Sequence, residues 1–338
     1  MSYKLSILDQ SPVFPGTTAA GALQKTVRLA QKAEQWGYSR FWVSEHHHSD
    51  QVAGSSPEVL ISYLLARTNS IRVGSGGVML QHYSPYKVAE NFHVLSSLAP
   101  GRVDLGIGKA PGGLPLSTKA LQFGTVNNGQ DFDERISLLQ KMIENSVELG
   151  HTLAGIQATP IPPEKPEIFL LGASVNSARL AAKLGISFVF AKFINSDERV
   201  LEQAAHLYRK DFPDGKLIIS LAVIAATTQT EAEQLTGERK IVKVYLQSGR
   251  SVTVQSFEQA EIFGNQSGEP YEITEQEADI IAGTPDYIKE VLNQLERAYG
   301  VDEFIIHTPI EKEAERLQSF QLLSPLRTGN KDVQPINI

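Results

Sequence analysis

Four consecutive ionisable residues, Glu45-His46-His47-His48, follow a short apolar run at residues 41–43. An imidazole titrates near neutral pH, so a histidine at this place could act as a general base or stabilise a developing anion. A metal cluster and an ordinary solvated loop are the alternative explanations of three adjacent histidines. The pattern predicts chemistry at the point where a buried strand ends, and the rest of the chain has to decide between these explanations.

Two glycine-rich segments follow later apolar runs. Gly74-Ser75-Gly76-Gly77 carries no bulky side chain, which allows a flat ligand to approach the backbone of Ser75, Gly76 and Gly77. Gly106-Ile107-Gly108-Lys109 adds a cation, and Lys109 is a suitable partner for a phosphate. A bulge or a tight turn explains the first segment equally well, and a solvated lysine is the ordinary explanation of the second.

A run of small and hydroxyl-bearing residues, Gly172-Ala173-Ser174-Val175-Asn176-Ser177, precedes a helical pattern. Free backbone N–H groups and the helix dipole favour an anion at such a helix start. Ser174 could also be an ordinary N-cap with no ligand present. If Lys109 and this helix start follow adjacent strands of one sheet, they predict a single clamp for the phosphate of a cofactor, with Ala173, Ser174 and Ser177 in contact with it.

The composition excludes several classes of function. The chain has 338 residues, a net charge of -7 and no cysteine. The acidic balance argues against nucleic acid or an anionic membrane as a partner. Without cysteine there are no disulfides, thiolate nucleophiles or cysteine-ligated metals, so redox chemistry needs a bound cofactor. The N-terminus lacks the pattern of a signal peptide, and no run approaches about 18 apolar residues, so we expect a cytoplasmic protein that acts on a small molecule.

Strand and helix patterns alternate along the chain. Eight apolar runs predict strands, and each is followed by an amphipathic helical pattern. This alternation indicates a parallel sheet, and eight strands favour a closed (β/α)₈ barrel over an open doubly wound sheet. The predicted strands are residues 5–8, 41–43, 71–74, 102–108, 167–171, 186–190, 216–224 and 303–306. The predicted helices are residues 18–37, 57–67, 86–98, 132–148, 176–184, 197–210, 285–299 and 311–323.

Residues 227–282 break this rhythm. They contain the turn-rich clusters Gln247-Ser248-Gly249-Arg250 and Gly264-Asn265-Gln266-Ser267-Gly268. The segment therefore predicts an insertion between the seventh strand and its helix. An insertion on this side of a barrel is either a lid or pocket wall, or a disordered or decorative loop.

Segments spread over most of the chain resemble the bacterial luciferase-like, flavin-dependent monooxygenases. They are Leu5-Ser6-Ile7-Leu8-Asp9-Gln10-Ser11-Pro12, Trp42-Val43-Ser44-Glu45-His46-His47, Val73-Gly74-Ser75-Gly76-Gly77-Val78, Gly101-Arg102-Val103-Asp104-Leu105-Gly106-Ile107-Gly108 and Gly283-Thr284-Pro285. The resemblance implies that residues 1–338 form a single luciferase-like (β/α)₈ barrel domain with an insertion after the seventh strand. It also implies that reduced flavin binds at the mouth formed by the carboxyl ends of the strands.

The resemblance assigns roles to individual positions. His46 matches the family's histidine beside the flavin, which supports formation and productive breakdown of the oxygen adduct of the flavin. His47 matches a residue that contacts a glutamate across a dimer, and Glu90 resembles that glutamate. Gly76-Gly77 stands where the family has a non-prolyl cis peptide bond against the flavin ring.

Lys109 matches an arginine on the flavin phosphate, and Ser174 and Ser177 match hydroxyl groups on the same phosphate. Lysine lacks the bidentate fork of arginine, which predicts a weaker hold on the phosphate. Gly108 replaces a reactive cysteine of luciferase, so no thiol is required there. The aromatic residue near the family's substrate pocket corresponds to Lys192 or Phe193, so long-chain aldehyde specificity and light emission are not implied.

These features predict an enzyme that uses reduced FMN and O₂ to oxygenate a small organic substrate, with His46 as its catalytic residue. No Rossmann fingerprint provides a dinucleotide site, so we expect the reduced FMN to come from a separate, transiently bound flavin reductase. We also expect a homodimer, with no metal, no nucleic acid and no membrane partner. The alternatives are a deazaflavin (F420)-dependent hydride transferase, a metal-dependent barrel hydrolase using His46, His48 and His307, and a non-catalytic flavin-binding protein.

Overall fold

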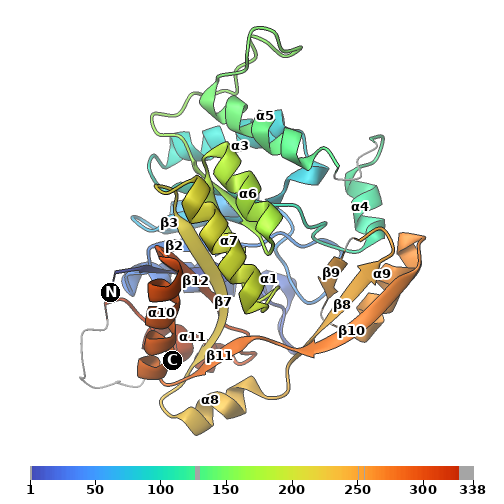
Figure 1. The fold of residues 1–338 in the computed structure, drawn as a ribbon. Coiled ribbons are helices and arrows are strands. Elements are labelled where there is room, and N and C mark those ends of the chain that lie inside the picture. The colour runs from blue at the N-terminus through green and yellow to red at the C-terminus, as the bar shows by residue number, and fades with distance from the viewer. Residues whose placement is uncertain (1, 126–129, 250, 255, 327–338) are drawn as a thin grey trace.

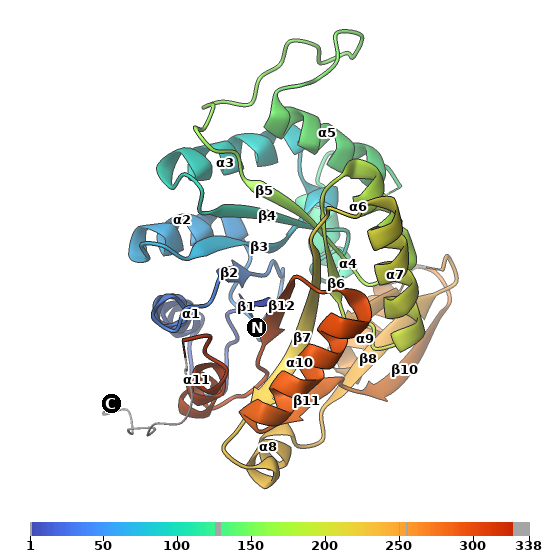
Figure 2. The same cartoon turned by 60° about the vertical axis from the view of Figure 1, so that its left-hand side comes forward.

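Eight parallel strands close into a barrel in the computed structural model, which describes residues 2–125, 130–249, 251–254 and 256–326 (Figures 1 and 2). Each strand pairs in parallel with its neighbour, and one further pairing closes the ring. The predicted (β/α)₈ barrel is confirmed. In ring order the strands are β1 (Lys4–Asp9), β2 (Arg40–Val43), β3 (Arg72–Met79), β4 (Val103–Gly108), β5 (Glu167–Gly172), β6 (Ser187–Ala191), β7 (Leu217–Ala225) and β12 (Glu303–His307).

Helices follow the strands and cover the outside of the barrel, as Figure 2 shows. They are α1 (Ala19–Gln35), α2 (Pro57–Arg67), α3 (Pro85–Leu98), α5 (Phe132–Glu144), α6 (Val175–Leu184), α7 (Glu198–Asp211), α10 (Pro285–Tyr299) and α11 (Glu313–Leu322). Thr18 and Thr284 cap the starts of α1 and α10 through their side chains, and Gly185 and Gly300 end α6 and α10 in the left-handed conformation. In the described part of the chain, no helix combines the length and apolar character needed to cross a membrane.

Two short helices that the sequence does not predict lie in the connections after β3 and β4. They are η1 (Leu80–His82) and α4 (Pro115–Leu121). Each is too short to produce a clear periodic pattern. The helix α5 also ends earlier than expected, at Glu144, because Asn145 adopts a left-handed C-cap with φ of 51°.

The insertion between β7 and α10 has its own secondary structure. It consists of α8 (Gln229–Thr236), β8 (Lys240–Leu246), β9 (Ser251–Val254), α9 (Phe257–Ser267), β10 (Tyr271–Glu277) and β11 (Ile280–Gly283). The strands β10, β8 and β9 form an antiparallel sheet, and Val242, Val244 and Phe263 belong to a small apolar core between this sheet and α9. The strand β11 pairs in parallel with the last residues of β7 and returns the chain to the barrel.

A cluster of buried charges fills the barrel near the amino ends of its strands. Arg40 on β2 donates to both carboxylate oxygens of Glu303 on β12, at 3.1 and 3.0 Å, and to Asp104 on β4, at 2.8 Å. Arg72 on β3 shares Asp104, and Glu167 on β5 lies 3.2 Å from Arg40. Burial opposes the charge of Arg40, but the three carboxylates outweigh it and raise the pKa of the guanidinium. These ion pairs therefore join five strands of the barrel.

An apolar layer lies inside the barrel next to these charges. Trp42 connects the two layers, because its indole N–H donates to Asp104 at 2.9 Å while its ring packs edge-on against Phe169 at 4.9 Å. The buried members of the layer are Leu8, Trp42, Phe169, Val189, Ile218 and Ile305. Side chains two residues apart on a strand point to the same side. The residues two positions after the members of this layer, toward the carboxyl end, therefore form the floor of the mouth.

Replacement of Arg40 by methionine should lower the free energy of unfolding by about 3–5 kcal/mol, because Glu303 would keep its burial and lose its cationic partner. Urea denaturation measures this difference. Arg28→Met is the matched control, since Arg28 is exposed and pairs with Glu313 at the surface, where such a pair contributes about 0–1 kcal/mol. Equal losses in the two variants would contradict a central role for the buried cluster.

Candidate active site at the barrel mouth

Glu45 organises the segment that follows β2. Its fully buried carboxylate accepts hydrogen bonds from the Met79 N–H at 3.0 Å and the Tyr83 hydroxyl at 2.8 Å, and lies 2.7 Å from Nε2 of His47. Burial and the Glu45 carboxylate raise the pKa of Tyr83, so its hydroxyl stays protonated and donates. Because Met79 ends β3, Glu45 fixes the ends of two neighbouring strands relative to each other.

His46 lies between Glu45 and His47 in the chain, and the residue is partly buried. The backbone N–H of His46 donates to Gly54 at 2.8 Å, and that of His47 donates to Gly112 at 2.7 Å, so loops on both sides hold this segment. Burial, followed by the nearby His47, lowers the pKa of His46 below its ordinary 6.5. The imidazole is therefore neutral at neutral pH and able to act as a hydrogen-bond partner or a base.

The other two histidines of the run point elsewhere. His47 binds Glu45 of its own chain, whereas His48 is exposed and has φ of 52°. Glu90 lies on α3, where it contacts Lys87 at 3.3 Å. A contact between His47 and Glu90 of two different subunits stays a prediction.

The metal site of the hydrolase alternative is not assembled. That alternative requires His46, His48 and His307 to converge on one ion. Throughout the described residues, no three histidine, aspartate or glutamate side chains are arranged to hold a metal. The geometry of the mouth therefore gives the hydrolase alternative no support.

The strand β3 presents bare backbone at the mouth. The peptide bond between Gly76 and Gly77 is cis, as the resemblance implies, and the register between β3 and β4 shifts at this point. A Cβ atom on Gly77 would come within 2.8 Å of the Gly106 carbonyl, so a larger residue does not fit there, whereas one on Gly76 would come within 2.8 Å of the Leu8 side chain. The Ser75 hydroxyl is buried and donates to Gly106 at 2.8 Å, so Ser75 acts on the shape of this strand.

The start of α6 carries the predicted hydroxyl groups. Ser174 accepts a hydrogen bond from the Ser177 N–H at 3.2 Å, and the two hydroxyl oxygens are 3.0 Å apart. The Ala173 carbonyl accepts from Asn195 at 2.9 Å, which anchors the turn before the helix. Ser174 is thus an N-cap, and the two hydroxyl groups and the N-terminus of a ten-residue helix lie together at the end of β5.

Lys109 follows β4, the strand next to β5. Its side chain is exposed, and its ammonium lies 5.6 Å from the centre of the Phe132 ring. No carboxylate within the described ranges forms an ion pair with it. The lysine lies against an aromatic ring and is available to meet an anion at the neighbouring strand end.

Comparisons with known proteins identify the family of this chain. Residues 3–303 match the model of the luciferase-like monooxygenase family. The chain belongs to this family. A Bacillus subtilis relative named N-acetyl-S-alkylcysteine monooxygenase is 51% identical over 324 residues, which cover 95% of this chain and 97% of the relative. The chain is therefore an oxidoreductase that uses molecular oxygen, as luciferase-like monooxygenases do.

Solved structures agree with this assignment. The structure of apo-MsnO8 is 32% identical, has a TM-score of 0.77, and covers 95% of this chain and 97% of its own. The oxygenating constituent of a Pseudomonas putida 3,6-diketocamphane monooxygenase, solved with FMN, is 20% identical with a TM-score of 0.69, over 96% of this chain and 98% of its own. The second likeness is evidence for the luciferase-like fold alone.

The structure separates the two candidates for the luciferase aromatic position. Phe193 packs against the apolar layer inside the barrel, and its ring lies 4.8 Å from that of His307. Lys192 is nearly buried and forms an ion pair with Asp279 of the insertion. Phe193 thus places an aromatic ring against this layer, while Lys192 joins the end of β6 to the insertion.

Three further polar positions lie at the mouth, of which the sequence predicts a role for His307 only in the metal alternative and none for Ser44 or Ser220. Ser44, Ser220 and His307 each follow an inward-facing residue of the apolar layer by two positions. Their buried atoms Ser44 Oγ, Ser220 Oγ and His307 Nε2 have no hydrogen-bond partner. The period of two along residues 216–224 predicts the direction of Ser220, but no sequence signal indicates that its hydroxyl stays unpaired.

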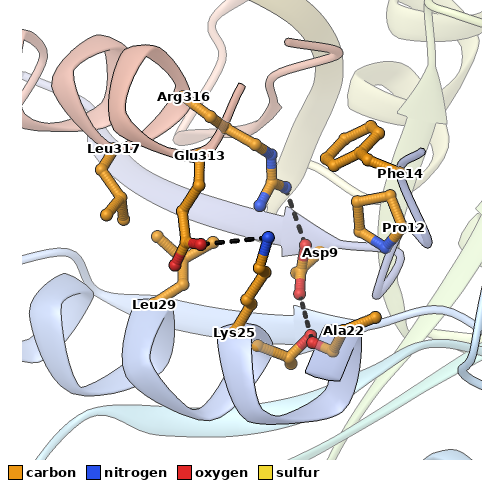
Figure 3. Close-up of a pocket in the computed structure, with 10 residues that line it drawn as sticks. Asp9, Pro12, Phe14, Ala22, Lys25, Leu29, Glu313, Arg316 and Leu317 are labelled. Atoms are coloured by element: carbon orange, nitrogen blue, oxygen red, sulfur yellow. Dashed lines mark hydrogen bonds and ion pairs between the residues drawn. The ribbon is translucent and has the colours of Figure 1, made fainter. Parts of the chain in front are cut away.

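A small cavity of about 20 Å³ lies beside the carboxyl end of β1, between this strand and the outer helices α1 and α11 (Figure 3). Its polar groups bind one another: Asp9 accepts from Arg316 at 2.7 Å and from Thr26 at 2.5 Å, and Lys25 pairs with Glu313 at 3.0 Å. The space holds about one water molecule. We therefore assign this cavity to the packing of α1 and α11 on the barrel.

Glu45→Ala should lower the free energy of unfolding by about 2–4 kcal/mol, because the buried Met79 N–H loses its acceptor and a cavity forms. Tyr83→Phe is the matched variant, which removes one hydrogen bond to the same carboxylate and should cost about 0.5–1.5 kcal/mol. Chemical denaturation measures both differences. A loss in Tyr83→Phe as large as that in Glu45→Ala would contradict the role of Glu45 as the common anchor.

Proposed function

We propose that this chain is an FMN-dependent monooxygenase that inserts one oxygen atom of O₂ into a small organic substrate. The observation that supports this proposal most is the combination of a neutral, partly buried His46 with the bare backbone of Gly76 and Gly77 at one barrel mouth. Reduced FMN supplies two electrons and activates O₂, so that one oxygen atom enters the substrate and the other becomes water.

The residues of the mouth fit the shape and charge of FMN. The flat ring would lie against Gly76 and Gly77, where no side chain projects. The phosphate would meet the hydroxyl groups of Ser174 and Ser177 and the N–H groups at the start of α6, with Lys109 supplying a positive charge. His46 would hold a proton or a hydrogen bond at the reacting edge of the ring, and the buried surroundings would exclude water.

The substrate that we propose is an N-acylated S-alkylcysteine or a related thioether. The proposal rests on the 51% identity to the Bacillus subtilis relative of that name, over nearly the full length of both chains. Oxygen transfer to the thioether sulfur would give a sulfoxide. The mouth offers apolar contacts to an alkyl chain through Phe193 and the neighbouring Leu171.

We also propose that a separate flavin reductase supplies the reduced FMN and that the chain forms a homodimer. Support for the dimer comes from the adjacent helices α2 and α3, on which Val59, Tyr63, Val94 and Leu98 are exposed at 68, 47, 43 and 70%. Glu90 lies on the same helix α3. A monomeric mass in analytical ultracentrifugation at micromolar concentration would contradict the dimer.

A deazaflavin remains the second candidate cofactor. An F420-dependent secondary alcohol dehydrogenase has the same fold, with 15% identity and a TM-score of 0.64 over 96% of this chain and 99% of its own. Hydride transfer would not need O₂, whereas the proposed oxygenation does. The third candidate is a non-catalytic flavin-binding protein. It would bind the flavin, and replacing His46 by alanine would leave the oxygen-dependent turnover of the flavin unchanged.

Reduced FMN at about 100 times its dissociation constant should stabilise the folded chain by about 2.7 kcal/mol, which thermal unfolding under anaerobic conditions detects. Lys109→Ala and Ser174→Ala should each reduce this stabilisation. Lys183→Ala is the control, because Lys183 is exposed at the opposite end of α6 and cannot meet the phosphate. Stabilisation by F420 in place of FMN would favour the hydride transferase.

His46→Ala should reduce oxygenated product per unit time by roughly 10²- to 10⁴-fold while FMN binding persists. His48→Ala should leave the rate unchanged, because His48 is exposed beside the site. Since burial lowers the pKa of His46, kcat/KM should fall only at a pH lower than an ordinary histidine would cause, as the imidazole becomes protonated. If kcat/KM of His46→Ala falls at low pH as it does in the wild type, a group other than His46 causes the pH dependence.

A further inference from the structure

The wall of the mouth formed by β7 and β12 carries two unpartnered polar atoms, Oγ of Ser220 and Nε2 of His307. The two strands are adjacent and parallel, with Ser220 opposite Ile305 and His307 opposite Ala222. Both side chains share the inward direction of Ile305, which lies in the apolar layer of the barrel. We call Ser220 and His307 the β7–β12 pair.

The two polar atoms of the β7–β12 pair are unfavourable for folding, because neither has a hydrogen-bond partner. Buried polar atoms are normally hydrogen-bonded, and leaving one without a partner opposes folding. The surroundings of His307 are apolar on the side of Phe193, whose ring lies 4.8 Å away at 70°. A phenylalanine at position 307 would fill this corner without an unpaired nitrogen, so the pair is better explained by a ligand.

Both members of the pair are uncharged at neutral pH. Burial, followed by the charge of Arg316, lowers the pKa of the His307 imidazole to about 4, and Asp9 opposes this effect only in part. Arg316 is itself held by Asp9 at 2.7 Å. A neutral imidazole and a hydroxyl group can each donate one hydrogen bond, which suits an uncharged acceptor oxygen.

The β7–β12 pair faces the proposed flavin site. In the ring of eight strands, β7 lies four positions from β3 and β12 lies four positions from β4. The pair is therefore on the wall opposite Gly76 and Gly77. A substrate bound between this wall and a flavin on β3 would have one end at the pair and its reacting atom toward the flavin.

We propose that Ser220 and His307 bind the acyl carbonyl oxygen of the N-acylated thioether substrate and thereby set its position in the mouth. This inference rests on the proposed function. His307 is partly exposed as a residue although its Nε2 is covered, and a turn of the ring about the Cβ–Cγ bond would bring the donor toward the substrate. Phe193, which lies in the turn after β6, would then pack against the substrate.

The test compares N-acetyl-S-methylcysteine with S-methylcysteine, which lacks the acyl carbonyl, using reduced FMN and O₂. The wild-type chain should prefer the acetylated compound in kcat/KM. His307→Phe and Ser220→Ala should each lower this preference by about 10-fold, mainly through a higher KM for the acetylated compound. His307→Gln keeps a side-chain donor and should restore part of the preference. Ser96→Ala is the control, because Ser96 is an equally buried, unpartnered hydroxyl on α3.

The possible outcomes separate the two proposals. If the wild-type chain oxygenates neither thioether, the proposed function fails and this inference fails with it. If the wild type prefers the acetylated compound and His307→Phe and Ser220→Ala keep that preference, the inference alone is overturned. A loss of preference equal to that in Ser96→Ala would also overturn it, because a general effect on packing would then explain the result.

Discussion

The buried guanidinium of Arg40 is the constraint on which the rest of the barrel depends. It binds Glu303 and Asp104, which come from strands on opposite sides of β2, and Glu167 lies beside it. Charges of this kind are stable in a low-dielectric interior only when each has its partner in place. The register of the strands is therefore fixed at their amino ends, and with it the height at which each strand ends at the mouth.

The two opposite sides of the mouth, both positioned by this fixed register, present different surfaces. On β3 and β4, glycines bring two backbones so close together that side chains are excluded, as the contacts of Gly77 and Gly106 show. On β7 and β12 the same layer carries Ser220 and His307, whose polar atoms stay unpaired. A flat ligand is suited to the first surface and a hydrogen-bonding one to the second, so the barrel offers distinct places for a cofactor and a substrate.

The sequence predicts the features that depend on local pattern. The eight strands and the insertion after the seventh follow from periodicity, and the cis bond at Gly76-Gly77 follows from the family resemblance. The strands of the insertion were not predicted, because β10 is largely polar on both faces and gains its stability from pairing with β8. The role of Glu45 was also missed, since its partners Met79 and Tyr83 come from a later segment that only the fold brings to it.

Burial has the same electrostatic effect on both sides of the mouth. It lowers the pKa of His46 beside β2 and of His307 on β12, so both imidazoles are neutral where water is scarce. Neutral groups can exchange or share a proton with a reacting centre, whereas a fixed positive charge in such a site would attract anions and resist further protonation. The acidic residues of the mouth agree with this arrangement, because Glu45 and Asp9 are already bound by donors and leave the histidines as the open partners for a ligand.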